Sequence, residues 1–220
     1  MNPLKFCGKA YWEKRFHEGD TPWDLGKATP LLEEALEFLR GLPGYGTGLG
    51  STKSAYVLSA GAGRGADALE LVRRGFNVVA VEWLSPAVET LRKRYEALGS
   101  DIKGSLSIIE GDFFKIEACK VDFAFEHTFF CALEPGFRTN YVDAMSRWLK
   151  PGGVLLGNFF IHSGSGGDIN DRCEPPFFIS KENLQAIFCC KFKLLYLAPA
   201  TQSGVGRRGD FEWLGVFERL

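Results

Sequence analysis

One stretch near the middle of the chain constrains the fold more than any other: YVLSAGAGRGADALELVRRGFNVVAVEW, residues 56–83. A short apolar run leads into a turn that contains Gly61, Gly63 and Gly65. A helical pattern follows the turn, and a second apolar run ends at the acid Glu82. Buried parallel strands joined by a glycine-rich turn and a helix have this pattern in Rossmann-like α/β proteins. The stretch therefore predicts a strand, a turn, a helix and a parallel second strand.

Strand and helix patterns continue to alternate toward the C-terminus. Further strands are expected over residues 106–112, 121–126 and 154–161, and further helices from Ser85-Pro86 to about residue 98, from Pro135 to the LKPGG sequence at 149–153, and over residues 180–188. Alternation of this kind predicts a parallel sheet covered on both faces. Residues 191–198 and 211–219 resemble two strands without a helix between them. The expected fold is α/β, with a seven-stranded, mostly parallel sheet and a terminal antiparallel hairpin.

The N-terminal region differs in character from this core. Residues 10–30 are aromatic and polar, with a short helix expected over residues 11–18 and turns after it. Thr29 followed by Pro30 predicts the start of a second helix, and residues 41–51 predict a glycine-rich connector. We expect one domain over residues 1–220, with an N-terminal lid and helices at 1–50 and a cofactor-binding core at 55–220.

Composition excludes several classes of function. The formal net charge of the 220 residues is −1, and no run of Lys or Arg is present. We therefore expect neither a nucleic-acid partner nor a membrane surface. The six cysteines form no C-x-x-C pair, and the first residues have no signal-like pattern. These features predict reduced thiols, no metal site and a cytoplasmic location. The protein is expected to be a monomer.

The glycine turn leaves two cofactors open. With Ala66, the turn satisfies the G-x-G-x-x-[GA] pattern of dinucleotide-binding proteins. Glu82 follows at the end of the second strand, where a carboxylate can accept hydrogen bonds from both ribose hydroxyls. A nicotinamide dinucleotide and S-adenosylmethionine both contain that ribose, so the turn and the acid alone do not distinguish them.

Three features favour S-adenosylmethionine. In EGDFF, residues 110–114, Asp112 is expected to face the adenine amino group and Phe113 to stack on the adenine ring. The LKPGG turn is usual in methyltransferases that use this cofactor. The dehydrogenase alternative lacks a Y-x-x-x-K motif and has no room for a substrate domain after residue 161.

Several longer blocks of sequence resemble one family. They are YWEKRFHEGDTPWDLGKATPLL, SAGAGRGADALELVRRGFNVVAVEWLSPAV, GDFF, FEHTFFCALEPGFRTNYVDAMSRWLKPGG and EPPFFIS. Residues 10–219 are similar to the thiopurine S-methyltransferase superfamily, and most similar to its halide/thiol (thiocyanate) methyltransferase branch. The resemblance implies a class I S-adenosylmethionine-dependent methyltransferase fold and that cofactor.

The resemblance also implies site residues at matching positions. The cofactor residues so implied are Trp12, Phe16 and Trp23 of the lid, Gly61 with Gly63 and Gly65 of the turn, Glu82, Asp112, Phe113 and His127. The substrate pocket is expected to include Thr128, Phe129 and Phe177. Four places depart from the family pattern: Phe16 stands where the family often has Trp, Ser59-Ala60 replaces Val-Pro, Glu126-His127 replaces Asp-Tyr, and Phe177 replaces the Tyr of the halide/thiol branch.

These residues imply methylation of a small thiol or soft anion, namely a thiol, bisulfide, thiocyanate or a halide. The departures leave two alternatives, a thiopurine-type enzyme for aromatic thiols and a module that binds the cofactor without catalysis. His127 is the one candidate catalytic residue, since its pKa range suits relaying a thiol proton or pairing with an anion. A histidine that only holds the lid by a hydrogen bond is the other interpretation of this position.

Overall fold

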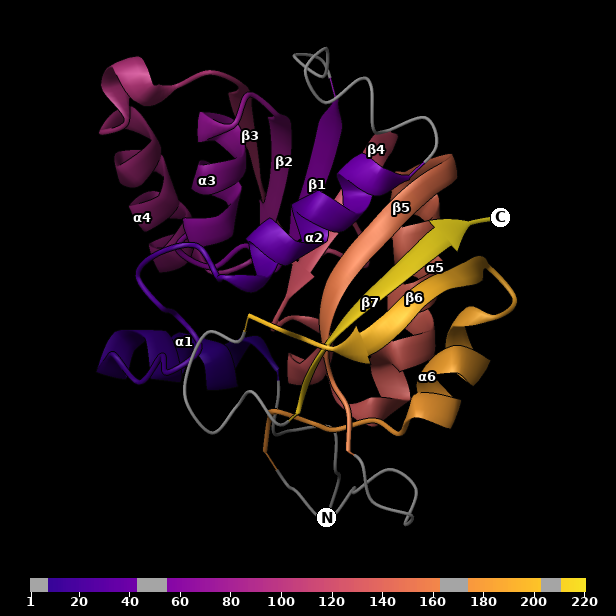
Figure 1. Ribbon diagram of the computed structural model, residues 1–220. Coiled ribbons are helices and arrows are strands. Elements are labelled where there is room, and N and C mark those ends of the chain that lie inside the picture. The colour runs from indigo at the N-terminus through magenta and orange to yellow at the C-terminus, as the bar shows by residue number, and fades with distance from the viewer. Residues whose placement is uncertain (1–7, 43–54, 163–173, 203–210) are drawn as a thin grey trace.

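The computed structural model describes residues 8–42, 55–162, 174–202 and 211–220. Seven strands form one sheet in the order β3-β2-β1-β4-β5-β7-β6, in which the first four pairings are parallel and β7 is antiparallel to both of its neighbours (Figure 1). The expected seven-stranded, mostly parallel sheet with a terminal antiparallel hairpin is confirmed. The predicted connector after residue 41 lies almost entirely outside the described residues.

The strands have the following bounds: β1 Tyr56–Ala60, β2 Asn77–Glu82, β3 Ser105–Glu110, β4 Val121–His127, β5 Leu149–Phe160, β6 Phe192–Pro199 and β7 Glu212–Arg219. The helices are α1 Lys9–Glu18, α2 Leu31–Gly41, α3 Ala66–Arg73, α4 Ser85–Glu96, α5 Arg138–Trp148 and α6 Lys181–Phe188. Short 3-10 turns occupy Gly99–Asp101, Phe130–Ala132 and Pro135–Phe137. No helix of the described ranges is both long and apolar enough to cross a membrane.

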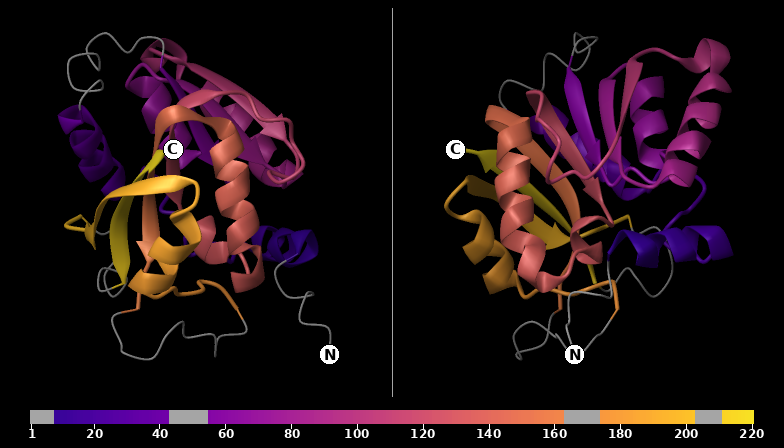
Figure 2. Two further views of the ribbon diagram at one scale, coloured as in Figure 1. Left: turned by 90° about the vertical axis from the view of Figure 1, so that its right-hand side faces the viewer. Right: turned by 180° about the vertical axis from the view of Figure 1, so that it is seen from behind.

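Two apolar cores cover the two faces of the sheet. Helices α2, α3 and α4 pack on one face, and α5 and α6 pack on the other, as the three views show (Figures 1 and 2). Alternate residues of β4 divide between the cores, with Phe123 and Phe125 on the α2 side and Ala124 on the α5 side. Burial on both faces explains why the central strands are continuous apolar runs in the sequence.

The carboxyl ends of the parallel strands meet at one edge of the sheet, and α1 lies across that edge (Figure 1). Gly61 follows β1, Glu82 ends β2 and His127 ends β4. The direction in which strands are added reverses between β1 and β4. In open α/β sheets this reversal opens a crevice where ligands bind. The topology thus brings three of the predicted site residues to one edge.

The structure corrects three local predictions. A 3-10 turn occupies Pro135–Phe137, and α5 begins at Arg138 instead of at Pro135. Strand β5 begins at Leu149 and includes the LKPGG sequence, because Leu149 pairs with Val121 before the register shifts. The helix expected to start at Thr29-Pro30 begins at Leu31, and Pro30 is its N-cap.

Candidate functional site

A cavity of about 430 Å³ lies at this edge, between α1 and the ends of β1, β2 and β4. Its volume is within the range of small-molecule sites. Of the predicted site residues, twelve line it: Trp12, Phe16, Trp23, Gly61, Gly63, Gly65, Glu82, Asp112, Phe113, His127, Thr128 and Phe129. Segments that are far apart in the sequence therefore build one site.

The glycine turn after β1 needs glycine for different reasons at its three positions. All three residues have a positive φ, which residues with a side chain rarely adopt. A Cβ at Gly61 would lie 2.7 Å from Cδ2 of Phe129, and a Cβ at Gly65 would collide with Leu91 of α4. Nothing lies within 4 Å of the Cβ position of Gly63. Gly61 and Gly65 thus allow close packing, whereas Gly63 leaves open space over the backbone.

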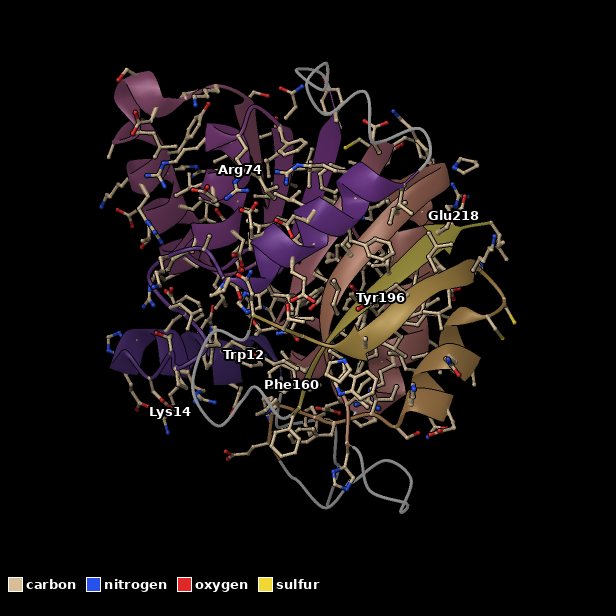
Figure 3. All side chains as sticks on the ribbon, viewed as in Figure 1. Trp12, Lys14, Arg74, Phe160, Tyr196 and Glu218 are labelled. Atoms are coloured by element: carbon tan, nitrogen blue, oxygen red, sulfur yellow. The ribbon has the colours of Figure 1, made fainter. Side chains whose placement is uncertain are left out.

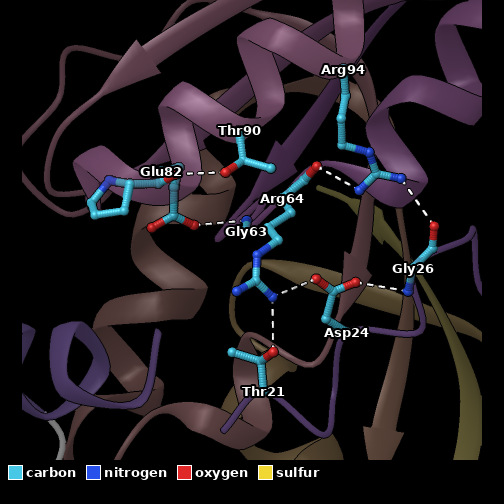
Figure 4. A network of polar contacts seen from close by, with 9 residues as sticks. Thr21, Asp24, Gly26, Gly63, Arg64, Glu82, Thr90 and Arg94 are labelled. Atoms are coloured by element: carbon cyan, nitrogen blue, oxygen red, sulfur yellow. Dashed lines mark hydrogen bonds and ion pairs between the residues drawn. The ribbon is translucent and has the colours of Figure 1, made fainter. Parts of the chain in front are cut away.

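Glu82 is buried at the end of β2 and holds the backbone around it. Its Oε2 accepts a hydrogen bond from the Gly63 N–H at 2.7 Å (Figure 4). Its Oε1 accepts from Trp83 N–H and Leu84 N–H at 2.9 Å each. Burial raises the pKa of this carboxyl, and the three N–H groups partly oppose the rise. A carboxylate offers about four acceptor positions, so one remains for a ligand hydroxyl. Glu82 therefore fits a ribose and also fixes the turn.

The two residues predicted to contact adenine, Asp112 and Phe113, follow β3 and both line the cavity. Asp112 lines the cavity, where its carboxylate accepts from the Phe114 N–H at 3.0 Å and pairs with Lys115 at 3.0 Å. Phe113 is only 5% exposed, and its ring packs against Phe129 and stacks on Trp148. Phe113 nevertheless lines the cavity, and its stacking on adenine stays a prediction.

Trp83 is a cavity residue that the sequence analysis missed. It follows Glu82 directly and lines the main cavity, and it also lines a smaller hollow with Glu110, Gly111 and Asp112. Trp83 could have been selected from the sequence, because it is an aromatic residue directly after the acid that ends the second strand. Trp83 therefore adds a second aromatic side chain to this part of the cavity, beside Phe113.

Helix α1 and the turn after it form the aromatic wall of the cavity. Trp12 meets Trp23 edge to face at 5.2 Å, and Phe16 lies 6.1 Å from Trp23. Figure 3 shows Lys14 pointing away from α1, and Trp12 and Phe160 at the end of the sheet nearest α1. None of the residues of α1 is fully buried. A helix with so little buried surface depends on a few specific contacts to stay in place.

Arginines supply those contacts. The guanidinium of Arg64, in the glycine turn, lies 2.9 Å from Asp24 Oδ2 and 2.8 Å from Thr21 Oγ1 (Figure 4). The same group stands 4.9 Å from the centre of the Phe16 ring, and Arg15 stands 4.7 Å from that of Trp23. One face of each of these two rings is therefore already occupied by a cation of the protein.

A buried acid, Glu126 of β4, holds the turn after β4 by hydrogen bonds. Glu126 Oε1 accepts from Phe129 N–H at 2.8 Å and Phe130 N–H at 2.9 Å, and Oε2 accepts from the Tyr141 hydroxyl at 2.9 Å. Burial raises the pKa of Glu126 and, together with Glu126, raises that of Tyr141 well above its usual range. Thr128 has a φ of 64°, which only a well-supported turn maintains. This support positions Phe129 against Gly61.

His127 ends β4 at the cavity wall and pairs with an acid that sequence analysis did not select. Its Nδ1 lies 2.8 Å from Asp67 Oδ2, in the first turn of α3. Burial lowers the pKa of His127, but the carboxylates of Asp67, Glu126 and Glu212 outweigh burial and raise it above its ordinary value. The pairing joins residues 60 positions apart, which no local pattern predicts.

The remaining wall is mostly apolar. Cys131, Leu133, Phe137 and Phe160 line it together with Phe129. Phe177 was predicted here, but it is 5% exposed and does not line the cavity, whereas the preceding Pro175 and Pro176 do. The Phe177 N–H donates to the Cys131 carbonyl at 2.7 Å, which fixes the backbone of Phe177 beside the turn after β4.

Known proteins with similar sequences share a methyltransferase chemistry. A probable thiol methyltransferase 2 of Arabidopsis thaliana is 32% identical, over 94% of this chain and 84% of that protein. Thiocyanate methyltransferase 1 of Brassica oleracea is 31% identical, over 95% and 84%. A thiopurine S-methyltransferase of Legionella pneumophila (strain Corby) is 23% identical, over 94% and 96%.

Solved structures agree with the fold. The 1,6-didemethyltoxoflavin-N1-methyltransferase of Burkholderia thailandensis, solved with S-adenosylhomocysteine, superposes with a TM-score of 0.66 at 18% identity, over 96% of this chain and 85% of that one. The glycopeptide N-methyltransferase MtfA with S-adenosylmethionine superposes with a TM-score of 0.64 at 17% identity, over 88% and 94%. The model of the thiopurine S-methyltransferase family matches residues 7–208. The chain therefore belongs to the thiopurine S-methyltransferase family of S-adenosylmethionine-dependent methyltransferases.

Proposed function

We propose that this protein transfers the methyl group of S-adenosylmethionine to a small thiol or soft anion: a thiol, bisulfide, thiocyanate or a halide. The observation that carries the proposal is the apolar wall after β4, made of Phe129, Cys131, Leu133 and Phe137 with Phe160 of β5. Polarizable sulfur and iodide lose less hydration than hard oxygen nucleophiles when they enter such a wall. Two relatives named for thiol and thiocyanate methylation support the same class of acceptor.

The cavity residues fit the cofactor. Gly63 leaves open space over the turn, the Glu82 carboxylate has one acceptor position left for a ribose hydroxyl, and Asp112 with Trp83 lies where an adenine would follow. Trp12, Phe16 and Trp23 of the aromatic wall also line the cavity. When bound, the cofactor supplies an electrophilic methyl group on a sulfonium sulfur.

The protein's main task in such a transfer is alignment. A soft nucleophile that lies on the Phe129 side of the cavity must face the methyl carbon, with the leaving sulfur behind it. Holding two reactants in line and excluding water supply most of the rate increase that such a site can give. The ring contacts of Phe129 with Phe113 and Tyr141 fix the wall against which the nucleophile rests.

A panel of nucleophiles tests the proposal. Bisulfide, thiocyanate, iodide, thiophenol and a thiopurine are each supplied with S-adenosylmethionine, and formation of S-adenosylhomocysteine is measured. We expect turnover of the small soft nucleophiles. Turnover of the thiopurine alone would favour the aromatic-thiol alternative. Calorimetric binding of the cofactor without turnover of any acceptor would favour the binding module without catalysis.

A further inference from the structure

The pairing of His127 with Asp67 is fixed on both sides. The imidazole Nδ1 lies 2.8 Å from Asp67 Oδ2, and the other oxygen, Oδ1, accepts from the Thr29 N–H at 2.7 Å. The side chains of His127 and Asp67 are only 12% and 15% exposed. Because Asp67 is held by both oxygens, the carboxylate cannot turn away, and the imidazole ring keeps one orientation.

This pairing selects one tautomer of the neutral ring. An ionised carboxylate only accepts hydrogen bonds, so the shared hydrogen belongs to Nδ1 of His127. The neutral ring then has its lone pair on Nε2. Among the described residues, no group forms a hydrogen bond with Nε2. Nε2 is also absent from the fully buried polar atoms that have no partner, so it is not sealed from the cavity. It is therefore open to the cavity that His127 lines.

The charges around His127 favour uptake of a proton. Asp67 on α3, Glu126 on β4 and Glu212 on β7 act on the ring, and together they raise its pKa although burial lowers it. On the neighbouring strand β5, the residue in register with His127 is the uncharged and fully buried Asn158. A raised pKa makes the neutral imidazole a stronger base, closer to the pKa of about 8.5 of an ordinary thiol.

We propose that His127 is the general base of this site, that Asp67 is its positioning residue, and that the substrate is a thiol or hydrogen sulfide that arrives protonated. This inference rests on the proposed function and names its substrate class. Iodide and thiocyanate have no proton to give, so a paired base at the cavity wall is of no use to them. The pair should therefore speed methylation of protonated thiols more than methylation of anions such as iodide and thiocyanate.

The step balances as follows. The thiol S–H bond breaks, its proton moves to His127 Nε2, and the S–H electron pair stays on sulfur as a thiolate. A sulfur–methyl bond then forms as the methyl–sulfonium bond breaks, and the electrons of that bond remain on the cofactor sulfur. The imidazolium finally releases its proton to water. Throughout, Asp67 stays ionised, and its contact with Nδ1 stabilises the positive ring.

The first test measures His127 without any turnover. In the full-length protein without cofactor, two-bond proton–nitrogen spectra follow the three histidines with pH, and His127→Gln assigns the signal of His127. We expect a pKa above the ordinary value and hydrogen on Nδ1 in the neutral form. In Asp67→Asn the pKa should fall, and in Glu70→Gln it should not change. Glu70 lies on the same helix and bonds Arg74 at 2.9 Å, so that variant is the matched control. An unchanged His127 pKa in Asp67→Asn would overturn the positioning role.

The second test compares an alkyl thiol with iodide. The kcat/KM of the wild type for the thiol should rise with pH through the pKa that the spectra give for His127. His127→Gln should lower thiol kcat/KM by about 100-fold and Asp67→Asn by about tenfold at neutral pH. Iodide kcat/KM should change less than threefold in both variants, and Glu70→Gln should match the wild type with both acceptors.

The outcomes separate the two proposals. Equal losses with thiol and iodide in His127→Gln would make His127 an anion site or a structural residue, and would overturn the general base alone. Thiol turnover that neither variant changes would do the same. Binding of S-adenosylhomocysteine to a wild type that methylates neither acceptor would overturn the proposed function, and the general base with it.

Discussion

Arg64 Nη1 lies 2.9 Å from Asp24 Oδ2, so an ion pair joins the glycine turn to the wall of α1 and residues 19–26 (Figure 4). Both side chains are more than 70% buried, which limits screening by solvent. The pair therefore ties the turn after β1 to the aromatic wall. Because α1 has no fully buried residue, the pair is one of the few contacts that hold it.

Loss of this pair should loosen the wall. Arg64→Ala should raise amide hydrogen exchange over residues 9–26, and should weaken binding of S-adenosylhomocysteine by about 1 kcal/mol. Arg73→Ala is the control, since Arg73 pairs with Glu70 at the surface at 3.7 Å. In the wild type, binding of S-adenosylhomocysteine should increase the protection of α1 amides from hydrogen exchange. Equal exchange in wild type and Arg64→Ala would show that α1 is held by its ring contacts alone.

Glu82 should contribute to cofactor affinity and to the shape of the turn. Glu82→Gln should weaken calorimetric binding of S-adenosylhomocysteine by about 1–3 kcal/mol, because its amide nitrogen cannot accept from a ribose hydroxyl or from the Gly63 N–H. The raised pKa of Glu82 also predicts how affinity depends on pH. The affinity for S-adenosylhomocysteine should decrease as pH falls through that pKa, because the protonated carboxyl loses acceptor capacity. Glu89→Gln removes an exposed acid that pairs with Lys93 and does not line the cavity, so it serves as the comparison. Unchanged binding by Glu82→Gln would remove Glu82 from the ribose site.

Gly61 should be intolerant of a side chain because of Phe129. Gly61→Ala should lower the free energy of unfolding by about 2–4 kcal/mol, from its φ of 62° and from the contact at 2.7 Å. Gly63→Ala carries the strain of its φ of 55° but meets no neighbour, so its loss should be smaller, about 1–2 kcal/mol. Urea unfolding of Gly61→Ala, Phe129→Ala and the double variant measures the coupling free energy between the two positions. Strictly additive losses would mean that the ring moves aside.

The Asp67–His127 pair should stabilise the fold in a pH-dependent way. The folded pKa of His127 is raised, so the folded protein binds this proton more tightly than the unfolded chain does. The stabilisation is therefore complete below the unfolded pKa of about 6.5 and is lost as pH rises through the folded pKa. The difference in unfolding free energy between wild type and Asp67→Asn should shrink from pH 5.5 to pH 9. A difference that stays constant would mean that the pair is not charged in the folded protein.

Local patterns predicted the parts of this protein that depend on neighbouring residues. The stretch from residue 56 to 83 predicted a strand, a turn, a helix and a second strand, which the structure has in that order. The ends of the strands place Gly61, Glu82 and His127 at one edge of the sheet. Parallel strands bring their carboxyl ends together in any doubly covered sheet, so the alternation of elements already predicts where the site lies. The cofactor turn and its acid therefore required no tertiary information.

Packing decided what each side chain does at that edge. Phe113 lines the cavity but also stacks on Trp148, whereas Phe177 does not line the cavity. The pairs Asp67–His127 and Arg64–Asp24 join residues 60 and 40 positions apart. Sequence periodicity determines which face of an element is buried, but the partner of a buried charge depends on how α3, β4 and the α1 wall meet. Only the tertiary structure contains that arrangement.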